Sequence, residues 1–504
     1  MSYTNTPSRR SPLGNFRLSL QPAPAWTAIL ALAIFTLLGS LAGASSIMRL
    51  AFPLGAFVVG IFLYRRYPIL YLGFTWWLWF LTALVRRIID LRGGWAEPSP
   101  VLLAPFLVTL VTVVTLLRYL PKSYRMGGLP FVLSLTGVVY AVLIGLINSR
   151  YGLDHTIINV IAANNLTYTL SNVILKALDW VTPILFSFHI FANWQHYPEY
   201  RQNIQRVFRW AVLILGVYGI VQYVMPLEWD RFWLANVAGG NFSFGRPEPF
   251  GMRVFSTMTS TAPFAQMMVA GLILVLADQG ILRIFGAGFG FISLLLTLVR
   301  AAWGGWVLGF LIFSSSLKAK LQMRLLVTVL IVGICAFPLT AVEPFSTVIT
   351  SRVQSITNVQ EDYSYQARAA SYNRALGAAP FQYLGNGLGL PGLDSAFLDV
   401  ILQMGWLGGI PYLGGLILVL LKLPQCLKIK SDPFLTATTA ISFASFGMLI
   451  FNNVFASIQG VLFWSFIGIS FAGHKYYQQQ RTAAQREFLQ LNFKEEFPSR
   501  QQNL

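Results

Sequence analysis

Charged residues are scarce in this sequence. Only 11% of its 504 residues are Asp, Glu, Lys or Arg, whereas a soluble domain carries about 25%. Hydrophobic residues make up 55% of the chain, and they are grouped in runs close to the length that crosses a bilayer core. This composition excludes a secreted enzyme, a disordered chain and a soluble nucleic-acid-binding protein. It indicates a polytopic membrane protein.

Cysteine and histidine are also rare. The two cysteines, Cys335 and Cys426, lie in an apolar run and in a short basic loop, so no disulfide framework is available. The four histidines show neither the His-Glu-x-x-His spacing nor a Cys/His ligand pattern. We therefore expect no metal site and no cofactor.

Acidic residues are half as frequent as basic ones, with 18 Asp and Glu against 36 Lys and Arg. In a soluble protein this excess would suggest a nucleic-acid partner, but cytoplasmic loops of membrane proteins accumulate Lys and Arg. With both termini placed inside, the inner segments hold about twice as many cations as the outer ones. The charge pattern thus predicts a cytoplasmic N-terminus and C-terminus. Arg86, Arg87 and Arg92 are the exception, because they fall on an outer hairpin.

The apolar runs predict an all-α fold, a polytopic bundle of about 12 to 14 transmembrane helices. We expect a cytoplasmic N-terminal tail over residues 1–26, a membrane domain over 27–473 and a polar cytoplasmic tail over 474–504. Two segments predicted on the outer side are long, about 227–255 and 343–398. Long loops in compact proteins tend to be functional, so we expect the site there.

Every cation assigned to the outer side is an arginine. Arg253 precedes one apolar run, and Arg300 stands at the junction of two. An arginine at membrane depth is costly and usually functional, and its planar guanidinium suits bidentate phosphate binding. The alternative is that arginines extend to lipid headgroups, an interpretation that fits Arg49 and Arg150 better than Arg300.

The second long outer segment contains a stretch that is compatible with a helix at residues 363–374. If it is helical, Ser364, Arg368 and Tyr372 lie on one face because they are spaced four residues apart. An arginine between two hydroxyl groups on one face is a candidate binding surface for a phosphate-bearing or sugar-bearing substrate.

A glycine run at 385–392 contains a formal Gly-x-Gly-x-x-Gly motif. A dinucleotide site would need a strand before the motif and a helix after it, whereas this run lies in an outer segment before a membrane span. We therefore interpret it as a tight backbone path into that span. Asp394 follows directly and is either a proton-transfer group or a helix N-cap, a role that Ser395 could also take.

These segments together resemble the O-antigen ligase and polymerase superfamily. Residues 300–303, Arg-Ala-Ala-Trp, resemble its Ser-Arg-small-small-Trp segment, with Val299 where serine is usual. Residues 352–389 are similar to the extracytoplasmic loop of that family, and 402–408 to the helix that follows. Residues 250–266 resemble an upstream segment more loosely.

The resemblance implies a metal-independent glycosyltransferase at the outer face of the bacterial inner membrane. Its donor would be a polyprenyl-diphosphate-linked saccharide, its acceptor a second saccharide, and its surroundings the lipid bilayer together with other polysaccharide assembly proteins. No nucleic-acid partner is expected. The implied substrate-binding residues are Arg253, Arg300, Arg352, Ser364, Arg368 and Tyr372.

Ligases of the family have a His-Asn pair where this chain has Asp394 and Ser395. An aspartate there resembles the exopolysaccharide-polymerase branches. We therefore expect a polymerase of repeat units in exopolysaccharide or O-antigen synthesis, with Asp394 as the candidate catalytic base. The alternatives are an O-antigen ligase that transfers the glycan to lipid A core, and a polysaccharide-related transporter. A transporter requires charged residues within the spans, where Lys176, Asp179 and Asp278 are the candidates.

Overall fold

The structure is a computed structural model. It describes residues 22–151, 169–237, 244–278, 280–317, 363–389, 392–429 and 432–496, together with the single positions 319, 322, 323 and 330. For residues 363–368 and 490–496 it describes the backbone alone. Arg352 lies outside the described residues, as do the side chains of Ser364 and Arg368.

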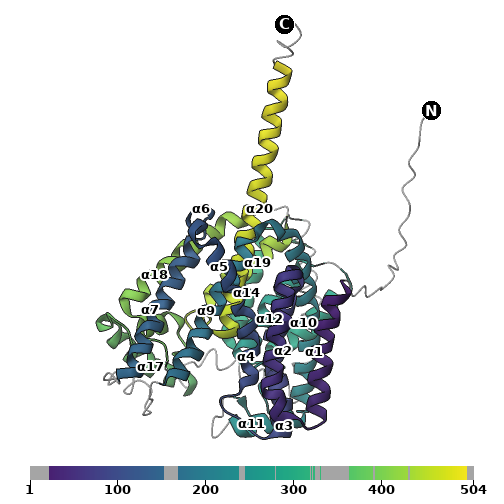
Figure 1. Cartoon of the computed structure of the whole chain (residues 1–504), viewed down its shortest axis with the longest axis vertical. Helices are drawn as coiled ribbons and strands as arrows, with labels where there is room; N and C mark the ends of the chain where they lie inside the picture. The colour runs from purple at the N-terminus through teal and green to yellow at the C-terminus, as the bar shows by residue number, and fades with distance from the viewer. Residues whose placement is uncertain are drawn as a thin grey trace, which may run out of the picture.

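The described residues are helical and form no strand, which confirms the all-α prediction (Figure 1). The first half contains α1 (Ala23–Leu41), α2 (Ser45–Arg66), α3 (Pro68–Gly93), α4 (Leu103–Leu110), α5 (Val113–Tyr119), α6 (Ser123–Met126), α7 (Leu129–Tyr151), α9 (Leu170–Ala192), α10 (Tyr197–Val224) and α11 (Glu228–Val237). The second half contains α12 (Thr261–Leu276), α13 (Leu282–Leu296), α14 (Arg300–Ser315), α17 (Tyr363–Ala378), α18 (Ala396–Leu427), α19 (Pro433–Met448) and α20 (Ser457–Glu496).

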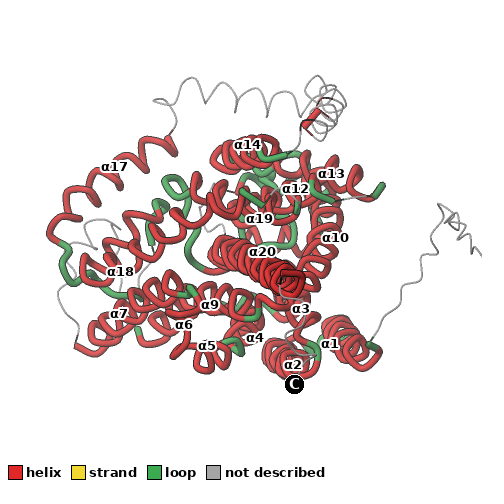
Figure 2. Tube along the Cα trace, turned by 90° about the horizontal axis from the view of Figure 1, so that it is seen from above, coloured by secondary structure: helices red, strands yellow, loops and turns green. Residues whose placement is uncertain are grey.

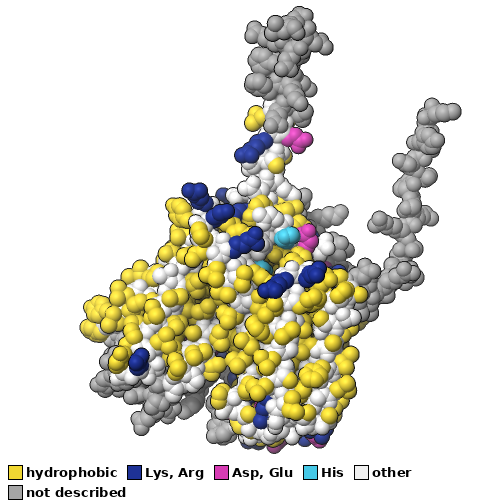
Figure 3. All heavy atoms as spheres, viewed as in Figure 1, with side chains coloured by type: hydrophobic (Ala, Val, Ile, Leu, Met, Phe, Trp, Pro, Cys, Tyr) yellow, Lys and Arg dark blue, Asp and Glu magenta, His cyan; other side chains and the backbone are white. Residues whose placement is uncertain are grey.

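Eight helical segments of the described chain are long and apolar enough to cross a bilayer, as expected of a multi-pass membrane protein. They are Ala23–Leu41, Ser45–Arg66, Pro68–Gly93, Pro100–Met126, Leu129–Tyr151, Leu170–Ala192, Trp194–Val224 and Ala396–Leu427. Large apolar side chains cover much of the face of the bundle that Figure 3 shows. Leu54, Val58 and Leu117, for example, are 59%, 65% and 67% exposed. Contiguous apolar surface of this kind requires a lipid or protein partner.

One predicted span is interrupted. The run at 99–117 forms α4 and α5, separated by a turn at Val111 and Thr112 rather than one continuous helix. The hydroxyls of Thr109 and Thr112 donate to the carbonyls of Pro105 and Thr109, at 2.6 and 2.7 Å. Side-chain hydroxyls that bond the preceding turn bend helices, which accounts for the break.

The amino-terminal half of α20 lies at the centre of the bundle (Figure 2). Trp464 is fully buried there, and two glycines on the same helix allow close approach to α9, where Gly460 faces Pro183 and Gly468 faces Ser187. Small residues at helix contacts let backbones approach in membrane bundles. α20 continues as a helix past residue 474 to Glu496, so the first part of the predicted polar tail is helical.

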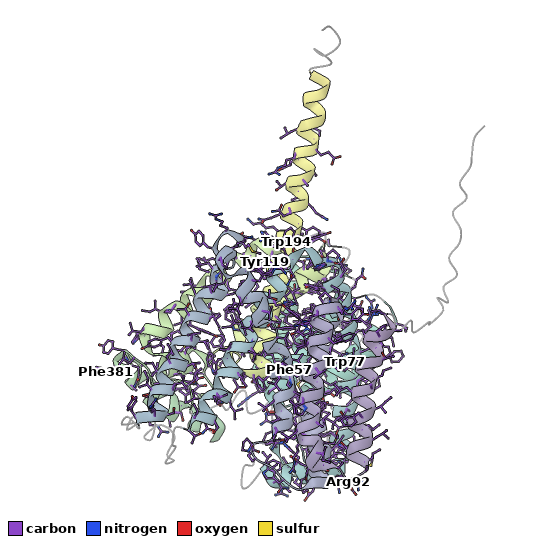
Figure 4. The ribbon with its side chains drawn as sticks, viewed as in Figure 1. Phe57, Trp77, Arg92, Tyr119, Trp194 and Phe381 are labelled. Carbon is purple, nitrogen blue, oxygen red and sulfur yellow. The ribbon has the colours of Figure 1, made fainter. Side chains whose placement is uncertain are left out.

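The two ends of the bundle differ in charge. We call the end that carries α6 and the projecting part of α20 the tail end, and the end that carries α11 the loop end (Figure 1). Lys and Arg gather towards the tail end in Figure 3. In Figure 4, Tyr119 and Trp194 are labelled at the tail end and Arg92 at the loop end.

Candidate functional site

Arg253 lies in the segment that precedes α12 and is half-buried. Its Nε donates to the carbonyl of Thr297 at 3.2 Å, and its Nη2 donates to the carbonyl of Leu298 at 3.3 Å. These carbonyls belong to the turn that follows α13. Arg253 therefore ties its own segment to the turn between α13 and α14.

That turn positions Arg300. Leu298 has φ 56°, a left-handed conformation that is costly for a side chain with a Cβ, and the hydrogen bond from Arg253 to its carbonyl helps to hold it. The chain then reverses, and Arg300 becomes the first residue of α14. A helix amino-terminus carries partial positive charge and free N–H donors. Arg300, half-buried there, adds a full positive charge, so this place favours an anion.

Residues 363–374 are helical, because they belong to α17, and this meets the condition under which Ser364, Arg368 and Tyr372 share a face. The spacing that was expected to align them is therefore present in the backbone. The Tyr372 hydroxyl donates to the carbonyl of Ile450 at 3.2 Å, which fixes this face of α17 beside the chain that follows α19.

Asp394 is exposed and lies two residues before α18. The N-cap position of α18 belongs to Ser395, whose side chain makes no capping hydrogen bond, so the N-cap interpretation of Asp394 is wrong. The turn that carries Asp394 is held by buried Asp399 instead. One Asp399 oxygen accepts from the backbone N–H of Leu393 at 3.0 Å, and the other accepts from Asn453 at 2.6 Å.

Residues 449–456, which we call the 449–456 loop, connect these elements. The loop is joined to α17 by the bond from Tyr372 and to Asp399 by the bond from its own Asn453. It is also joined to α18, because the carbonyl of Leu449 accepts from the N–H of Ala396 at 3.1 Å. α14 and α19 pack side by side, with Gly305 facing Met448. Because the two helices run in opposite directions, Arg300, just over one turn before Gly305, lies level with this loop. The structure thus places Arg300, on the turn that Arg253 binds, level with the loop that contacts Tyr372 and adjoins the turn of Asp394.

The glycine run confirms the interpretation of a tight backbone path. Gly385 and Gly387 adopt φ 73° and 75°, which favour glycine. The N–H groups of Asn386, Gly387 and Leu388 donate to carbonyls of α18 and α7, at 2.8, 2.8 and 2.9 Å. These donors are therefore not available to cradle a phosphate, and no strand precedes them in the described chain. The dinucleotide interpretation remains excluded.

The same run explains a break in α18. Gly405 has φ 62° and interrupts the helix. Beyond the break, the N–H groups of Trp406 and Leu407 donate to the carbonyls of Gln382 and Tyr383, at 2.9 and 3.1 Å. The residues just before the glycine run thus supply acceptors beyond the break, the run itself supplies N–H donors to the carbonyls of Leu402 and Gln403, and it lies between α7 and α18.

Replacing Gly385 by alanine is expected to destabilise the protein by about 2 to 4 kcal/mol, the sum of left-handed backbone strain and overpacking. A Cβ at this position would meet backbone atoms of Met404 and Gly405, which cannot move aside easily. Gly414→Ala, in the helix α18 that Gly385 packs against, is the control, because a Cβ there meets nothing within 4 Å. Thermal unfolding in detergent should show a lower midpoint for the first variant alone. Equal midpoints would contradict the assigned backbone path.

Arg49 and Arg86 belong to a buried ion-pair network that the sequence analysis missed. Asp90, which is fully buried, accepts from Arg86 Nε at 3.1 Å and from Arg49 Nη2 at 3.3 Å. Arg86 also binds Glu97 at 2.7 Å, and its guanidinium lies 4.7 Å from the centre of the Trp95 ring. The lipid-headgroup interpretation of Arg49 is therefore wrong, because its partner is a buried carboxylate.

Arg87 forms the second buried pair. It binds Asp230 of α11, and its Nη2 donates to the carbonyl of Ser256 at 2.6 Å. Arg87 is 1% exposed and Asp230 is fully buried. Because Ser256 follows Arg253 by three residues, Arg87 anchors the segment that carries Arg253. The sequence signal that could have revealed these pairs is the presence of carboxylates within or beside apolar runs that also contain arginine.

The charged residues considered for transport also have partners. Lys176 Nζ binds Asp179 at 3.4 Å within α9. Asp278, at the end of α12, binds Arg209 of α10. Such pairs are sufficient to account for these charges structurally. Among the described residues, no group of three or more His, Cys, Asp or Glu side chains is arranged to hold a metal ion.

No protein-family model matches the chain, and no curated protein matches it.

Proposed function

We propose that the protein is a membrane glycosyltransferase of the O-antigen ligase and polymerase type, which polymerises polyprenyl-diphosphate-linked repeat units in exopolysaccharide or O-antigen synthesis. The observation that carries the proposal is the placement of Arg300. Arg300 is the first residue of α14, and the turn before it is held by Arg253. It lies level with the 449–456 loop. That loop accepts a hydrogen bond from Tyr372 and adjoins the turn that carries Asp394.

The proposal includes a topology of about 12 to 14 spans, with both termini in the cytoplasm and the loop end at the outer face of the bacterial inner membrane. The gathering of Lys and Arg towards the tail end supports this orientation. Residues 343–398 would form the long extracytoplasmic loop, with α17 inside it. Arg352, Ser364 and Arg368 then belong to the donor site by the resemblance.

In the proposed reaction, an acceptor hydroxyl attacks the anomeric carbon of the donor saccharide. The bond from that carbon to the diphosphate oxygen breaks, and a new glycosidic bond forms. The lipid diphosphate leaves with its electron pair, and Arg300 together with the α14 amino-terminus stabilises the charge that develops on it. Asp394, which is exposed, takes the proton from the acceptor hydroxyl as general base.

Carbohydrate profiling of a deletion strain tests this proposal against the ligase. A polymerase deletion should leave single repeat units and remove high-molecular-weight polysaccharide. A ligase deletion should instead leave polymer on the lipid carrier and lipopolysaccharide without it. Unchanged polysaccharide in the deletion strain would overturn both assignments. Substrate uptake by proteoliposomes would favour the transporter.

Complementing the deletion with Asp394→Asn is expected to reduce polymer formation by about 10²-fold or more, because general-base catalysis contributes about that factor. The amide keeps the shape of the side chain and removes its capacity to accept the proton. Glu248→Gln, at another exposed carboxylate before α12, is the matched control and should give normal polymer. Normal polymer from Asp394→Asn at equal protein level would exclude Asp394 as the base.

A further inference from the structure

A cavity of about 930 Å³ lies between α1, α2, α3 and α10. Its walls are largely apolar and aromatic, with Trp26 and Leu37 from α1, Phe52 from α2, Phe74 and Trp77 from α3, and Trp210 from α10. α1 stands at the margin of the bundle in Figure 2. Ala33 and Leu37 of α1 line the cavity and are exposed, so α1 leaves part of the cavity unfilled.

The cavity is elongated along the bundle. Its lining runs along α1 from Trp26 to Ser40 and along α3 from Leu70 to Ile88. At a rise of 1.5 Å per residue, these stretches are roughly 21 and 27 Å long. This length approaches the thickness of the hydrocarbon core of a bilayer, about 30 Å. A single extended hydrocarbon chain therefore fits the cavity in both length and polarity.

The hydroxyls of Thr36, Ser40 and Thr82 also line the cavity, but each donates to a carbonyl of its own helix. The charged side chains of the lining, Arg206 and Arg209, lie with Asn203 near the tail end of α10. Arg209 is neutralised by Asp278, whereas Arg206 is exposed and forms no ion pair with any described residue. Arg283 is close by, since its guanidinium donates to the carbonyl of Asp278 at 3.1 Å. Two arginines therefore line this end of the cavity and a third lies near it, whereas Asp278 is the one carboxylate paired with them.

We propose that this cavity binds one anionic phospholipid, with an acyl chain along α1 and α3 and its phosphate at Arg206. An excess of positive charge beside a membrane-spanning apolar cavity matches the chemistry of an anionic headgroup joined to a hydrocarbon chain, because basic pockets between transmembrane helices bind such headgroups. A zwitterionic lipid such as phosphatidylcholine brings a choline cation together with its phosphate, so it would leave the excess positive charge beside the cavity uncompensated. Arg206 lies towards the tail end, opposite Arg300, so the site is separate from the proposed donor site.

Native mass spectrometry of the full-length protein in a non-ionic detergent tests the proposal. The probes are phosphatidylglycerol and phosphatidylcholine with identical acyl chains, titrated separately. The wild-type protein should retain phosphatidylglycerol in preference to phosphatidylcholine. Equal retention of the two lipids would overturn the proposal. Because lipid retention alone is measured, failure of this test is independent of the proposed glycosyl transfer.

Two pairs of variants locate the site. Arg206→Gln is expected to weaken phosphatidylglycerol binding about fivefold, which is the factor for one basic residue near a phosphate headgroup. The control is Arg125→Gln, at an exposed arginine of α6. It should leave phosphatidylglycerol binding unchanged. Ala33→Phe fills the cavity and should reduce retention of both lipids. Its control is Ile34→Phe, because Ile34 is 55% exposed and does not line the cavity. Wild-type retention by either Arg206→Gln or Ala33→Phe would contradict the assigned position.

Discussion

The Arg300→Ala variant is expected to lose polymer formation by roughly 10²-fold or more while the protein remains in the membrane at its normal level. Removing one donor aimed at developing charge costs about 10² to 10³ in rate in enzymes that depend on it. Arg300 is at the amino-terminus of α14, where its charge adds to that of the free N–H groups. The measurement is the yield of high-molecular-weight polysaccharide in a complemented deletion strain.

A lysine at position 300 separates charge from geometry. Arg300→Lys keeps the positive charge and loses the planar fork that binds phosphate oxygens in pairs, so its polymer yield should fall between wild type and Arg300→Ala. The matched control is Arg231→Ala, since Arg231 is an exposed arginine of α11 at the same end of the bundle. Normal polymer from Arg300→Ala at equal expression would refute the proposed donor site.

Local patterns in the sequence were sufficient to predict much of the fold. The all-α architecture follows from composition, because long apolar runs admit helices that satisfy their own backbone hydrogen bonds. The tight path at Gly385 and Gly387 was also predicted, and the sequence of 363–374 was compatible with the helix found there, since each depends on residues close together in the sequence.

Interactions between distant segments were not predictable in the same way. Arg87 and Asp230 are 143 positions apart, and nothing in either local sequence specifies the other as its partner. The break at Gly405 is similar, because the acceptors that permit it come from Gln382 and Tyr383 across the chain. In both places a conformation or charge that is unfavourable locally is compensated by a remote segment.

In the candidate site, too, contacts between distant segments could not be predicted from the sequence. The position of Asp394 after the glycine run makes it a candidate from the sequence, but its neighbours in the sequence do not indicate how it is held. Asp399 is 2% exposed and binds Leu393, Gln403 and Asn453. It therefore acts as a positioning residue for the Asp394 turn and the 449–456 loop. Only the fold brings Asn453 to Asp399, because α19 returns the chain to the start of α18.

The Arg87→Ala variant is expected to lose about 3 to 5 kcal/mol of stability, the usual result when one partner of a buried ion pair is removed. Asp230 would keep its bond from the Tyr218 hydroxyl, at 2.8 Å, but would become a buried carboxylate without a cation. The carbonyl of Ser256 would lose its bond from Arg87 and keep the bond from Gln222, at 3.3 Å. The measurement is the thermal unfolding midpoint in detergent, with Arg92→Ala as the control because Arg92 is an exposed residue at the end of the same helix.

A double variant distinguishes an ion pair from simple loss of packing around Arg87. Arg87→Met with Asp230→Leu removes both charges and keeps apolar volume, and such replacements of buried pairs are often neutral or stabilising. We therefore expect the double variant to be more stable than Arg87→Ala. Its polymer yield should still be reduced, because neither new side chain donates to the Ser256 carbonyl that anchors the Arg253 segment. A double variant no more stable than Arg87→Ala would indicate that the unpaired charge is not the source of the destabilisation.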